Sequence, residues 1–242
     1  MNRITSKLKE SKKLLSIYFT AGFPKLEDTI DIIKRLQDAG VDMVEIGLPY
    51  SDPLADGPTI QQSSTQALKN GMSSLKLFEQ IQNIRKEVEI PLIVMGYFNP
   101  MLQFGVRKFC QTASDIGIDG FIIPDLPYDY WLEHHQKDYQ DFNLKHVQLI
   151  TPQTSVERIH KIDEQSQDAF IYMVSSSATT GSQSGFADEQ LNYFERIGSY
   201  NLKTPQIVGF GIKDETTFQQ ATKHAKGAII GSAFIKMLEK DG

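Results

Sequence analysis

The sequence has little of three things: cysteine, long hydrophobic runs and positive charge. Cys110 is the only cysteine among 242 residues, which excludes an internal disulfide framework and predicts a reducing, cytoplasmic setting. It follows Phe109 in a helical pattern, where we expect it to pack in the core. No apolar run approaches the roughly 18 residues that a membrane span needs. The N-terminal stretch MNRITSKLKESKK is polar and lacks the apolar centre of a signal peptide.

The charge balance is mildly acidic. The chain has 25 Lys and Arg against 30 Asp and Glu, for a net charge of −5, which argues against nucleic acid as a partner. It does not exclude a small phosphorylated substrate, because helix N-termini and backbone N–H groups bind phosphate locally whatever the net charge.

Short apolar runs rich in β-branched residues alternate with amphipathic stretches along the whole chain. The expected strands are residues 14–19, 43–47, 91–95, 120–124, 146–150, 169–174, 206–210 and 227–231. Strict alternation of strand and helix predicts a parallel sheet with right-handed crossovers. Both a barrel and an open doubly wound sheet are α/β folds. Eight such units in 242 residues favour a single (β/α)8 TIM barrel over the open sheet. No linker-like stretch interrupts the pattern, so we expect one domain over residues 1–242.

Two further patterns support repeated βα units. Helical periodicity predicts buried faces through Ile30, Ile32, Ile33 and Leu36, and through Leu75, Phe78, Ile81 and Ile84. The spacing Asp-x-Gly-x-Asp occurs twice, at residues 38–42 and 115–119, each time before a strand. Gly40 and Gly117 stand where the end of a helix needs a left-handed residue.

A barrel places its chemistry at the C-terminal ends of the strands. Alternation along the second strand puts Met43, Glu45 and Gly47 on one face and Val44 and Ile46 on the other. Glu45 should therefore point into the barrel. A carboxyl group there must be paired or have a raised pKa, so the alternatives are a structural ion pair or an acid–base catalyst.

The loop after this strand carries Asp56 among many turn-forming residues. On residue type alone, Asp56 could be a catalytic group, a turn residue or a helix N-cap. The last two strands end in Gly211 and in Gly231-Ser232. These are the places where barrels hold phosphate, although glycines there could also serve only a tight turn.

We expect no metal site. Glu133, His134 and His135 are adjacent in a helical stretch, and adjacent helical residues point about 100° apart and cannot chelate one ion together. The other histidines form no cluster in the sequence.

The loop after the second strand resembles the signature of the tryptophan synthase α chain family, and similar motifs follow in the order of that family over the whole length. The signature is Glu45-Ile-Gly-Leu-Pro-Tyr-Ser-Asp-Pro-Leu-Ala-Asp56-Gly-Pro-Thr-Ile-Gln61. The supporting motifs are Thr20-Ala-Gly-Phe-Pro24, Met95-Gly-Tyr-Phe-Asn-Pro100, Pro124-Asp-Leu-Pro127, Leu149-Ile-Thr-Pro152, Gly209-Phe-Gly-Ile212 and Gly231-Ser232.

The resemblance implies a lyase that cleaves indole-3-glycerol phosphate into indole and glyceraldehyde 3-phosphate. Glu45 and Asp56 would be its catalytic pair: the chemistry suits Glu45 to moving a proton at the indole C3 and Asp56 to accepting the ring N–H. The residues that the resemblance assigns to substrate binding are Tyr172, Thr180, Gly181, Gly211, Gly231 and Ser232. The rival interpretations are another phosphate-binding barrel, such as an isomerase, and a non-catalytic subunit that only activates a partner.

The resemblance also implies a partner, a tryptophan synthase β subunit in an α2β2 complex. The surface around Asp52, Pro53, Asn99 and Pro127 would face it. Pyridoxal phosphate would belong to that β subunit, and we expect no cofactor in this chain.

The chain departs from the family pattern at four positions. Ser176 and Ala178 stand where an arginine and a glycine are usual, and Phe23 stands where an aspartate is common. Tyr18 replaces a phenylalanine that often lines the indole pocket. The first three bear on loop closure and on communication with the partner, and none of the four alters the catalytic pair.

Overall fold

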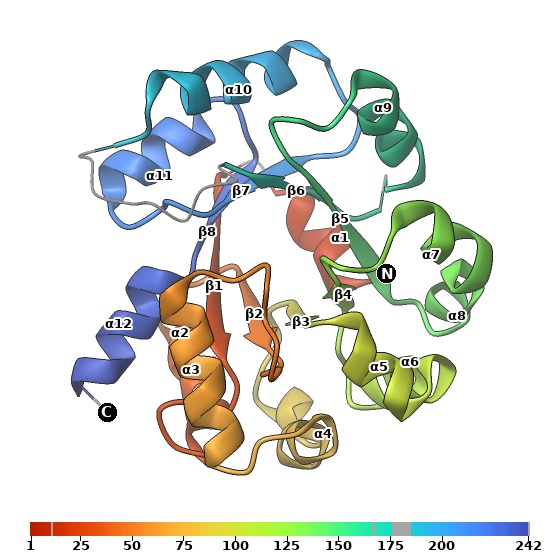
Figure 1. Ribbon diagram of the computed structural model, residues 1–242, viewed down its shortest axis with the longest axis vertical. Coiled ribbons are helices and arrows are strands. Elements are labelled where there is room, and N and C mark those ends of the chain that lie inside the picture. The colour runs from red at the N-terminus through yellow and green to blue at the C-terminus, as the bar shows by residue number, and fades with distance from the viewer. Residues whose placement is uncertain (11, 167, 176–184, 242) are drawn as a thin grey trace.

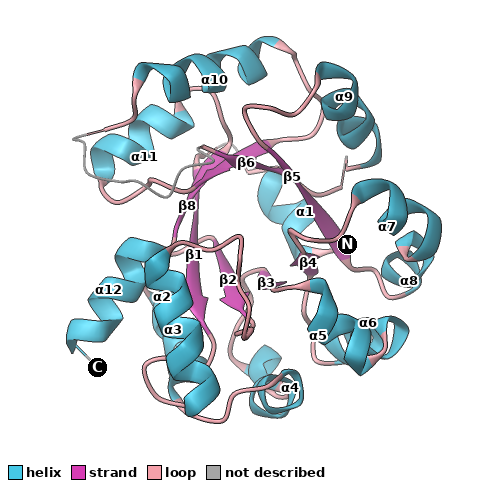
Figure 2. Cartoon of the chain, viewed as in Figure 1, coloured by secondary structure: helices cyan, strands magenta, loops and turns pink. Residues whose placement is uncertain are grey.

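Eight parallel strands close into a barrel with helices around the outside (Figures 1 and 2). The computed structural model describes residues 1–10, 12–166, 168–175 and 185–241. Neighbouring strands pair in chain order, and β1 also pairs with β8, so the sheet has no free edge. The predicted barrel is therefore confirmed, and the open doubly wound sheet is excluded.

Every expected strand is present, with ends that differ from the expected ones by at most two residues. The strands are β1 (Leu14–Thr20), β2 (Met43–Gly47), β3 (Leu92–Met95), β4 (Gly120–Ile122), β5 (Lys145–Ile150), β6 (Ile171–Val174), β7 (Gln206–Gly209) and β8 (Gly227–Ile230). The small differences arise because local pattern fixes the centre of a strand better than its ends, which depend on where the neighbouring strand stops.

The helices connect these strands, and all of them except α1 surround the barrel (Figure 1). They are α1 (Arg3–Leu8), α2 (Asp28–Asp38), α3 (Pro58–Lys69), α4 (Ser74–Ile81), the short 3-10 helix η1 (Ile84–Lys86), α5 (Phe98–Phe104), α6 (Val106–Asp115), α7 (Tyr128–His134), α8 (Gln136–Asp141), α9 (Val156–Gln165), α10 (Asp188–Ser199), α11 (Glu215–Thr222) and α12 (Ser232–Asp241). Among the described residues, no helix combines the length and apolar character that crossing a membrane requires.

The predicted helix faces are largely those that are buried. Ile32, Ile33 and Leu36 of α2 face the core, and Cys110 of α6 is buried as expected. The prediction for Leu75 is wrong, because its side chain is 59% exposed. Leu77 takes the inward position instead, and residues two apart on a helix lie on nearly opposite sides.

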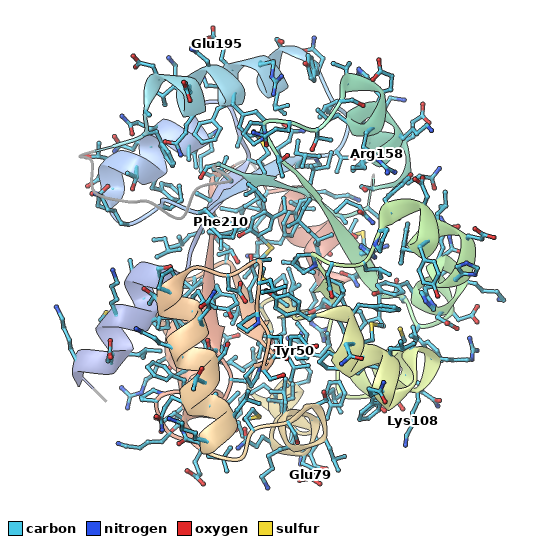
Figure 3. The ribbon with its side chains drawn as sticks, viewed as in Figure 1. Tyr50, Glu79, Lys108, Arg158, Glu195 and Phe210 are labelled. Atoms are coloured by element: carbon cyan, nitrogen blue, oxygen red, sulfur yellow. The ribbon has the colours of Figure 1, made fainter. Side chains whose placement is uncertain are left out.

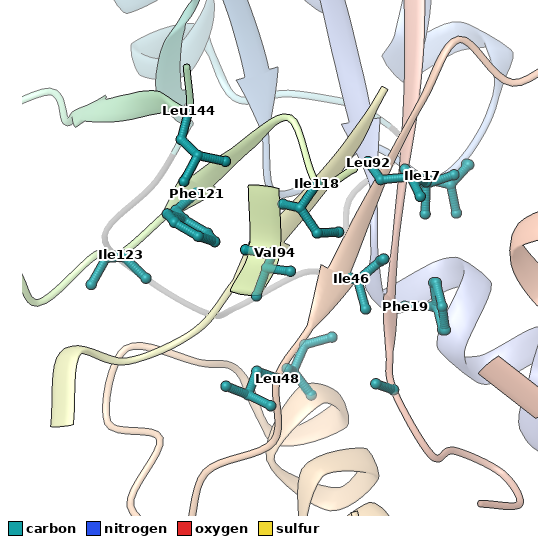
Figure 4. Close-up of a cluster of buried hydrophobic side chains, with 14 of the residues drawn as sticks. Ile17, Phe19, Ile46, Leu48, Leu92, Val94, Ile118, Phe121, Ile123 and Leu144 are labelled. Atoms are coloured by element: carbon teal, nitrogen blue, oxygen red, sulfur yellow. The ribbon is translucent and has the colours of Figure 1, made fainter. Parts of the chain in front are cut away.

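Two hydrophobic layers lie on the two sides of the sheet. The outer layer, between strands and helices, includes Ile17, Phe19, Ile46, Val94 and Phe121 (Figure 4). The interior layer is a separate cluster that alternates with it along each strand. Its members are Ile4, Leu14, Met43, Ile93, Ile122, Val147, Phe170, Tyr172, Ile207 and Ile229. Ile4 comes from α1, so this first helix closes the end of the barrel at which the strands begin.

The second aspartate of each Asp-x-Gly-x-Asp repeat ties two strands together. The Asp42 carboxylate accepts the backbone N–H of Leu15 at 2.9 Å, and the Asp42 N–H donates to the Leu15 carbonyl at 2.9 Å. Asp119 makes the same pair of bonds with Leu92, both at 2.9 Å. The repeat therefore holds the register of neighbouring strands at their N-terminal ends, a role that the sequence pattern alone did not reveal.

The two repeat glycines offer a matched test of backbone conformation against packing. Gly40 and Gly117 both have left-handed φ angles, +84° and +89°. A Cβ at Gly40 would meet no atom within 4 Å, whereas one at Gly117 would lie 2.6 Å from Cγ of Arg85. Arg85 cannot easily move, because it donates to the carbonyls of Gly117 and Ile90 at 2.8 and 2.7 Å.

We therefore expect Gly40→Ala to lower the free energy of unfolding by about 1 kcal/mol, the cost of a left-handed alanine. Gly117→Ala should cost that amount plus about 1–3 kcal/mol for overpacking. Urea unfolding of both variants beside the wild type measures the difference. Equal losses would contradict the packing role of Arg85.

Candidate active site

Glu45 lies in the middle of β2 with its side chain inside the barrel. Its exposed fraction is 0%, and its cross-strand neighbours are Tyr18 on β1 and Ile93 on β3. Val44 and Ile46, on either side of it in sequence, belong to the outer hydrophobic layer. The alternation along β2 predicted this orientation correctly.

The Glu45 carboxyl has one hydrogen-bond partner among the described residues. The Ser16 hydroxyl donates to its Oε1 at 2.9 Å, while Oε2 is buried without a partner. None of the ion pairs among the described residues includes Glu45, so the alternative of a structural ion pair finds no support there. Burial raises the pKa of Glu45 from 4.5 to about 8, against a smaller lowering by the Ser16 hydrogen bond. At neutral pH this carboxyl is mostly protonated.

Asp56 lies in the loop between β2 and α3. Tyr97, just after β3, donates its hydroxyl to Oδ2 of Asp56 at 3.1 Å, and the same hydroxyl accepts the N–H of Ala55 at 2.9 Å. The side-chain amide of Gln61 donates a hydrogen bond to the backbone carbonyl of Asp56 at 2.8 Å. Gly57, not Asp56, is the N-cap of α3, so the N-cap alternative is wrong. Burial raises the pKa of Asp56 to about 6, and the hydrogen bond from Tyr97 opposes this rise. With a pKa of about 6, the Asp56 carboxyl group is mostly ionised at neutral pH.

Two tyrosines, Tyr18 on β1 and Tyr172 on β6, each place their ring over a glycine on the next strand. A Cβ on Gly47 would come within 2.2 Å of the Tyr18 hydroxyl, and one on Gly209 within 2.0 Å of the Tyr172 hydroxyl. Only glycine at these positions leaves room for the two rings. Burial raises the pKa of both tyrosines, and the charges of Glu45 and Asp56 raise it further. Both carboxyl groups therefore lie within electrostatic reach of both hydroxyls.

Aromatic side chains also surround this group. Phe210, after β7, packs edge-on against Tyr172 with ring centroids 6.2 Å apart. Tyr50, after β2, packs on Tyr97 at 5.1 Å. In Figure 3, Phe210 and Tyr50 lie toward the centre of the molecule, whereas the charged residues Glu79, Lys108 and Glu195 lie at its outer edge.

The late glycines lie where the sequence predicted, directly after β7 and β8. Gly211 has a φ of +77°, so the turn itself favours glycine there. Gly231 lacks a left-handed φ, and a Cβ on it would meet its nearest neighbour, Tyr18, at an ordinary 3.5 Å. The tight-turn alternative therefore accounts for Gly211 but not for Gly231. Ser232 is exposed at the start of α12, a helix of 10 residues.

The loop after β6 contributes the remaining expected residues. Thr180 and Gly181, and the departures Ser176 and Ala178, lie outside the described residues. Tyr172 belongs to β6 itself and is buried in the interior layer.

Ser16 and Tyr97 are site residues that sequence reasoning missed. Strand alternation could have placed Ser16 on the same interior face as Tyr18, and a polar residue on the interior face of the strand beside Glu45 is the signal that was available. Tyr97 belongs to a motif that was noticed, but its bond to Asp56 joins residues 41 apart in sequence. Local patterns do not reveal such a contact. No group of three or more His, Cys, Asp or Glu side chains in the described ranges could hold a metal ion.

These features define a barrel enzyme with two carboxyl groups: Glu45, mostly neutral, inside the barrel on β2, and Asp56, mostly charged, in the loop after β2. A sequence profile of the family described as "Tryptophan synthase alpha chain" matches residues 4–242. The chain is 64% identical over 242 residues to a tryptophan synthase alpha chain of Flavobacterium johnsoniae, covering 100% of this chain and 95% of that one. It is 62% identical, with the same coverage, to that of Flavobacterium psychrophilum.

A solved structure agrees with these relatives. The alpha subunit of tryptophan synthase from Legionella pneumophila is 34% identical and superimposes with a TM-score of 0.88, over 98% of this chain and 88% of that one. The chain belongs to the tryptophan synthase alpha chain family. It is accordingly a lyase subunit of tryptophan biosynthesis that cleaves indole-3-glycerol phosphate and works with a β subunit.

The raised pKa of Glu45 predicts a pH-dependent cost of folding. Between pH 4.5 and about 8 the folded protein keeps the Glu45 proton that the unfolded chain releases, so stability falls as pH rises, by up to about 1.4 kcal/mol per pH unit. Glu45→Gln cannot ionise. We expect its stability relative to the wild type to increase through this window and to level off above it.

Chemical denaturation of both proteins at several pH values measures that difference, and the titration of all other groups, Asp56 included, cancels in the comparison. A difference that does not depend on pH would mean that Glu45 titrates near its ordinary value.

Proposed function

We propose that Glu45 is the proton shuttle of the cleavage reaction and that Asp56 stabilises the charge formed on the indole ring. The observation that carries the proposal is the buried Oε2 of Glu45, which has no partner among the described residues. An acid near pKa 8 can donate a proton at neutral pH and take one back in the next step.

The first step moves a proton from Glu45 Oε2 to C3 of the indole ring. The C2–C3 electron pair forms the new C–H bond, and the ring becomes a cation with its charge shared by C2 and the ring nitrogen. This step is required because an aryl carbanion is a poor leaving group. Asp56, which is mostly ionised, accepts the ring N–H and stabilises the cation. Tyr97 holds the Asp56 carboxylate for this purpose.

The second step breaks the bond between the ring and the side chain. The Glu45 carboxylate takes the proton of the hydroxyl group on the carbon attached to C3. The O–H electrons form the aldehyde C=O, and the electrons of the broken C–C bond restore the C2–C3 double bond. The products are indole and glyceraldehyde 3-phosphate, and Glu45 is protonated again. Two carboxyls in unlike environments thus hold the two protonation states that the reaction needs.

The ends of β7 and β8 are proposed to hold the substrate phosphate. Gly211 and Gly231 let the backbone approach the anion, and Ser232 adds a hydroxyl group at the start of α12. Gly181 would complete this group, and Thr180 would position the Asp56 loop. Tyr172 would line the indole pocket beside Glu45, and the Tyr18 hydroxyl adds a polar atom to the same wall.

The partner is proposed to bind the same end of the barrel in an α2β2 complex. Asp52, Asn99 and Pro127 are exposed there, and Leu54 in the Asp56 loop is 92% exposed, a large apolar side chain that a protein surface could cover. Pyridoxal phosphate would belong to the β subunit, since the cleavage is complete with the carboxyl groups of this chain. A biosynthetic enzyme with one cysteine fits the reducing cytoplasm.

Both rival functions leave features of the site unexplained. A phosphate-binding isomerase would use the late glycines, but it has no need of an Asp56 carboxylate placed to accept a ring N–H. A subunit that only activates its partner has no need of a buried carboxyl with a costly raised pKa.

Replacing Glu45 tests the catalytic assignment. Glu45→Gln keeps the shape of the side chain but cannot transfer a proton, so we expect turnover of indole-3-glycerol phosphate to fall by at least about 100-fold. Circular dichroism and a thermal melt establish that the variant is folded. A folded variant with turnover near the wild-type value would assign the proton transfer to another group.

Gly231 tests the phosphate site, because a Cβ there would meet the protein only at an ordinary contact distance of 3.5 Å. We expect Gly231→Ala to fold normally and Gly231→Val to raise KM for indole-3-glycerol phosphate by about tenfold, while KM for the dephosphorylated analogue changes little. The two substrates are compared on the same preparations. Equal losses for both would show that Gly231 serves folding rather than phosphate binding.

A further inference from the structure

Ser16 is a polar residue in an otherwise apolar part of the barrel interior. On β1 it lies between Leu14 and Tyr18, which pack with the interior layer, and its exposed fraction is 0%. Its hydroxyl donates to Oε1 of Glu45 at 2.9 Å. It lies nearer the start of β1 than Tyr18, the cross-strand neighbour of Glu45. Ser16 therefore contacts the carboxyl group from the side of the barrel where the strands begin, and it does not line the mouth of the barrel.

We propose that Ser16 is a positioning residue, whose hydroxyl occupies Oε1 of Glu45 and so leaves Oε2 as the oxygen that carries and delivers the proton. This inference rests on the proposed role of Glu45 as the proton shuttle. A neutral carboxyl has one accepting oxygen and one O–H group. With Oε1 accepting from Ser16, the proton belongs on Oε2, which is the oxygen without a partner among the described residues.

The same bond acts after the proton has left. A hydroxyl that donates to a carboxylate favours the ionised form and therefore opposes the effect of burial on the pKa of Glu45. Ser16 thus keeps the carboxyl capable of losing its proton in an apolar interior. An alanine or a valine at this position would leave both oxygens without the only partner found among the described residues.

Ser16→Ala tests the inference through the titration of Glu45. We expect the pKa of Glu45 to rise by about one to two units, the equivalent of one hydrogen bond to a charged group. The midpoint is measured by carbon-13 NMR of glutamate side-chain carboxyls, with Ser16→Ala/Glu45→Gln identifying the resonance. kcat should fall by roughly ten- to a hundredfold with KM changed less than about twofold, because Ser16 does not contact substrate. Ser16→Thr keeps the hydroxyl and should restore both values.

Ser63→Ala is the matched control. Ser63 is equally buried, at 1% exposure, and its hydroxyl pairs with Thr20 at 2.7 Å and makes no hydrogen bond to Glu45, so the Glu45 midpoint should not move. An unchanged midpoint in Ser16→Ala would overturn the inference, as would the same rise in Ser63→Ala. A lower midpoint would also overturn it, because it would mean that Glu45 donates its proton to Ser16.

The two proposals fail in different ways. If Glu45→Gln stays active while Ser16→Ala still raises the midpoint, the shuttle assignment is wrong and the orientation of the carboxyl by Ser16 stands. If Glu45→Gln is inactive and the midpoint in Ser16→Ala does not move, the shuttle stands and the role of Ser16 is wrong.

Discussion

Burying a carboxyl group inside a closed barrel fixes the protonation state of the site. Glu45 has no exposed surface and a single hydroxyl partner among the described residues, so its charged form is costly and its pKa rises to about 8. The barrel can carry this cost because the interior layer buries many apolar side chains, among them Met43 on the same face of β2 and Ile93 on the neighbouring strand. Exclusion of water raises the energetic cost of the charged form. It therefore keeps Glu45 protonated at neutral pH, so that the carboxyl group can donate its proton to a substrate.

The second carboxyl group, that of Asp56, has a lower pKa than Glu45 because its environment is less buried. Asp56 comes from a loop, keeps a partly exposed side chain and accepts a tyrosine hydroxyl, so its pKa rises only to about 6. One element, β2 with the loop that follows it, therefore presents an acid and a base separated by 11 positions in sequence. Tyr18 and Tyr172 are buried in the same part of the barrel, and burial, with the charges of Glu45 and Asp56 added to it, raises the pKa of both hydroxyl groups.

The sequence alone predicted what depends on local periodicity. All eight strands, the interior position of Glu45 and the left-handed glycines Gly40 and Gly117 followed from alternation and from capping. The errors and omissions involve contacts between segments. Leu75 fits the helical period but is exposed, because the packing partners of α4 select Leu77 instead. The bonds of Ser16 to Glu45 and of Tyr97 to Asp56 cross from one strand unit to another, so only the closed barrel brings them together.

The two ends of the barrel use buried polar groups in opposite ways. At the N-terminal ends of the strands, Asp42 and Asp119 are bonded to backbone N–H groups and to basic side chains. At the other end, Oε2 of Glu45 is left without a partner among the described residues. A fully satisfied carboxylate fixes strand register, whereas an unsatisfied one can act on a ligand. Because register is held at the first end, the second can keep an unsatisfied carboxyl group without loss of the fold, and this division allows a stable barrel to hold a costly acid in its interior.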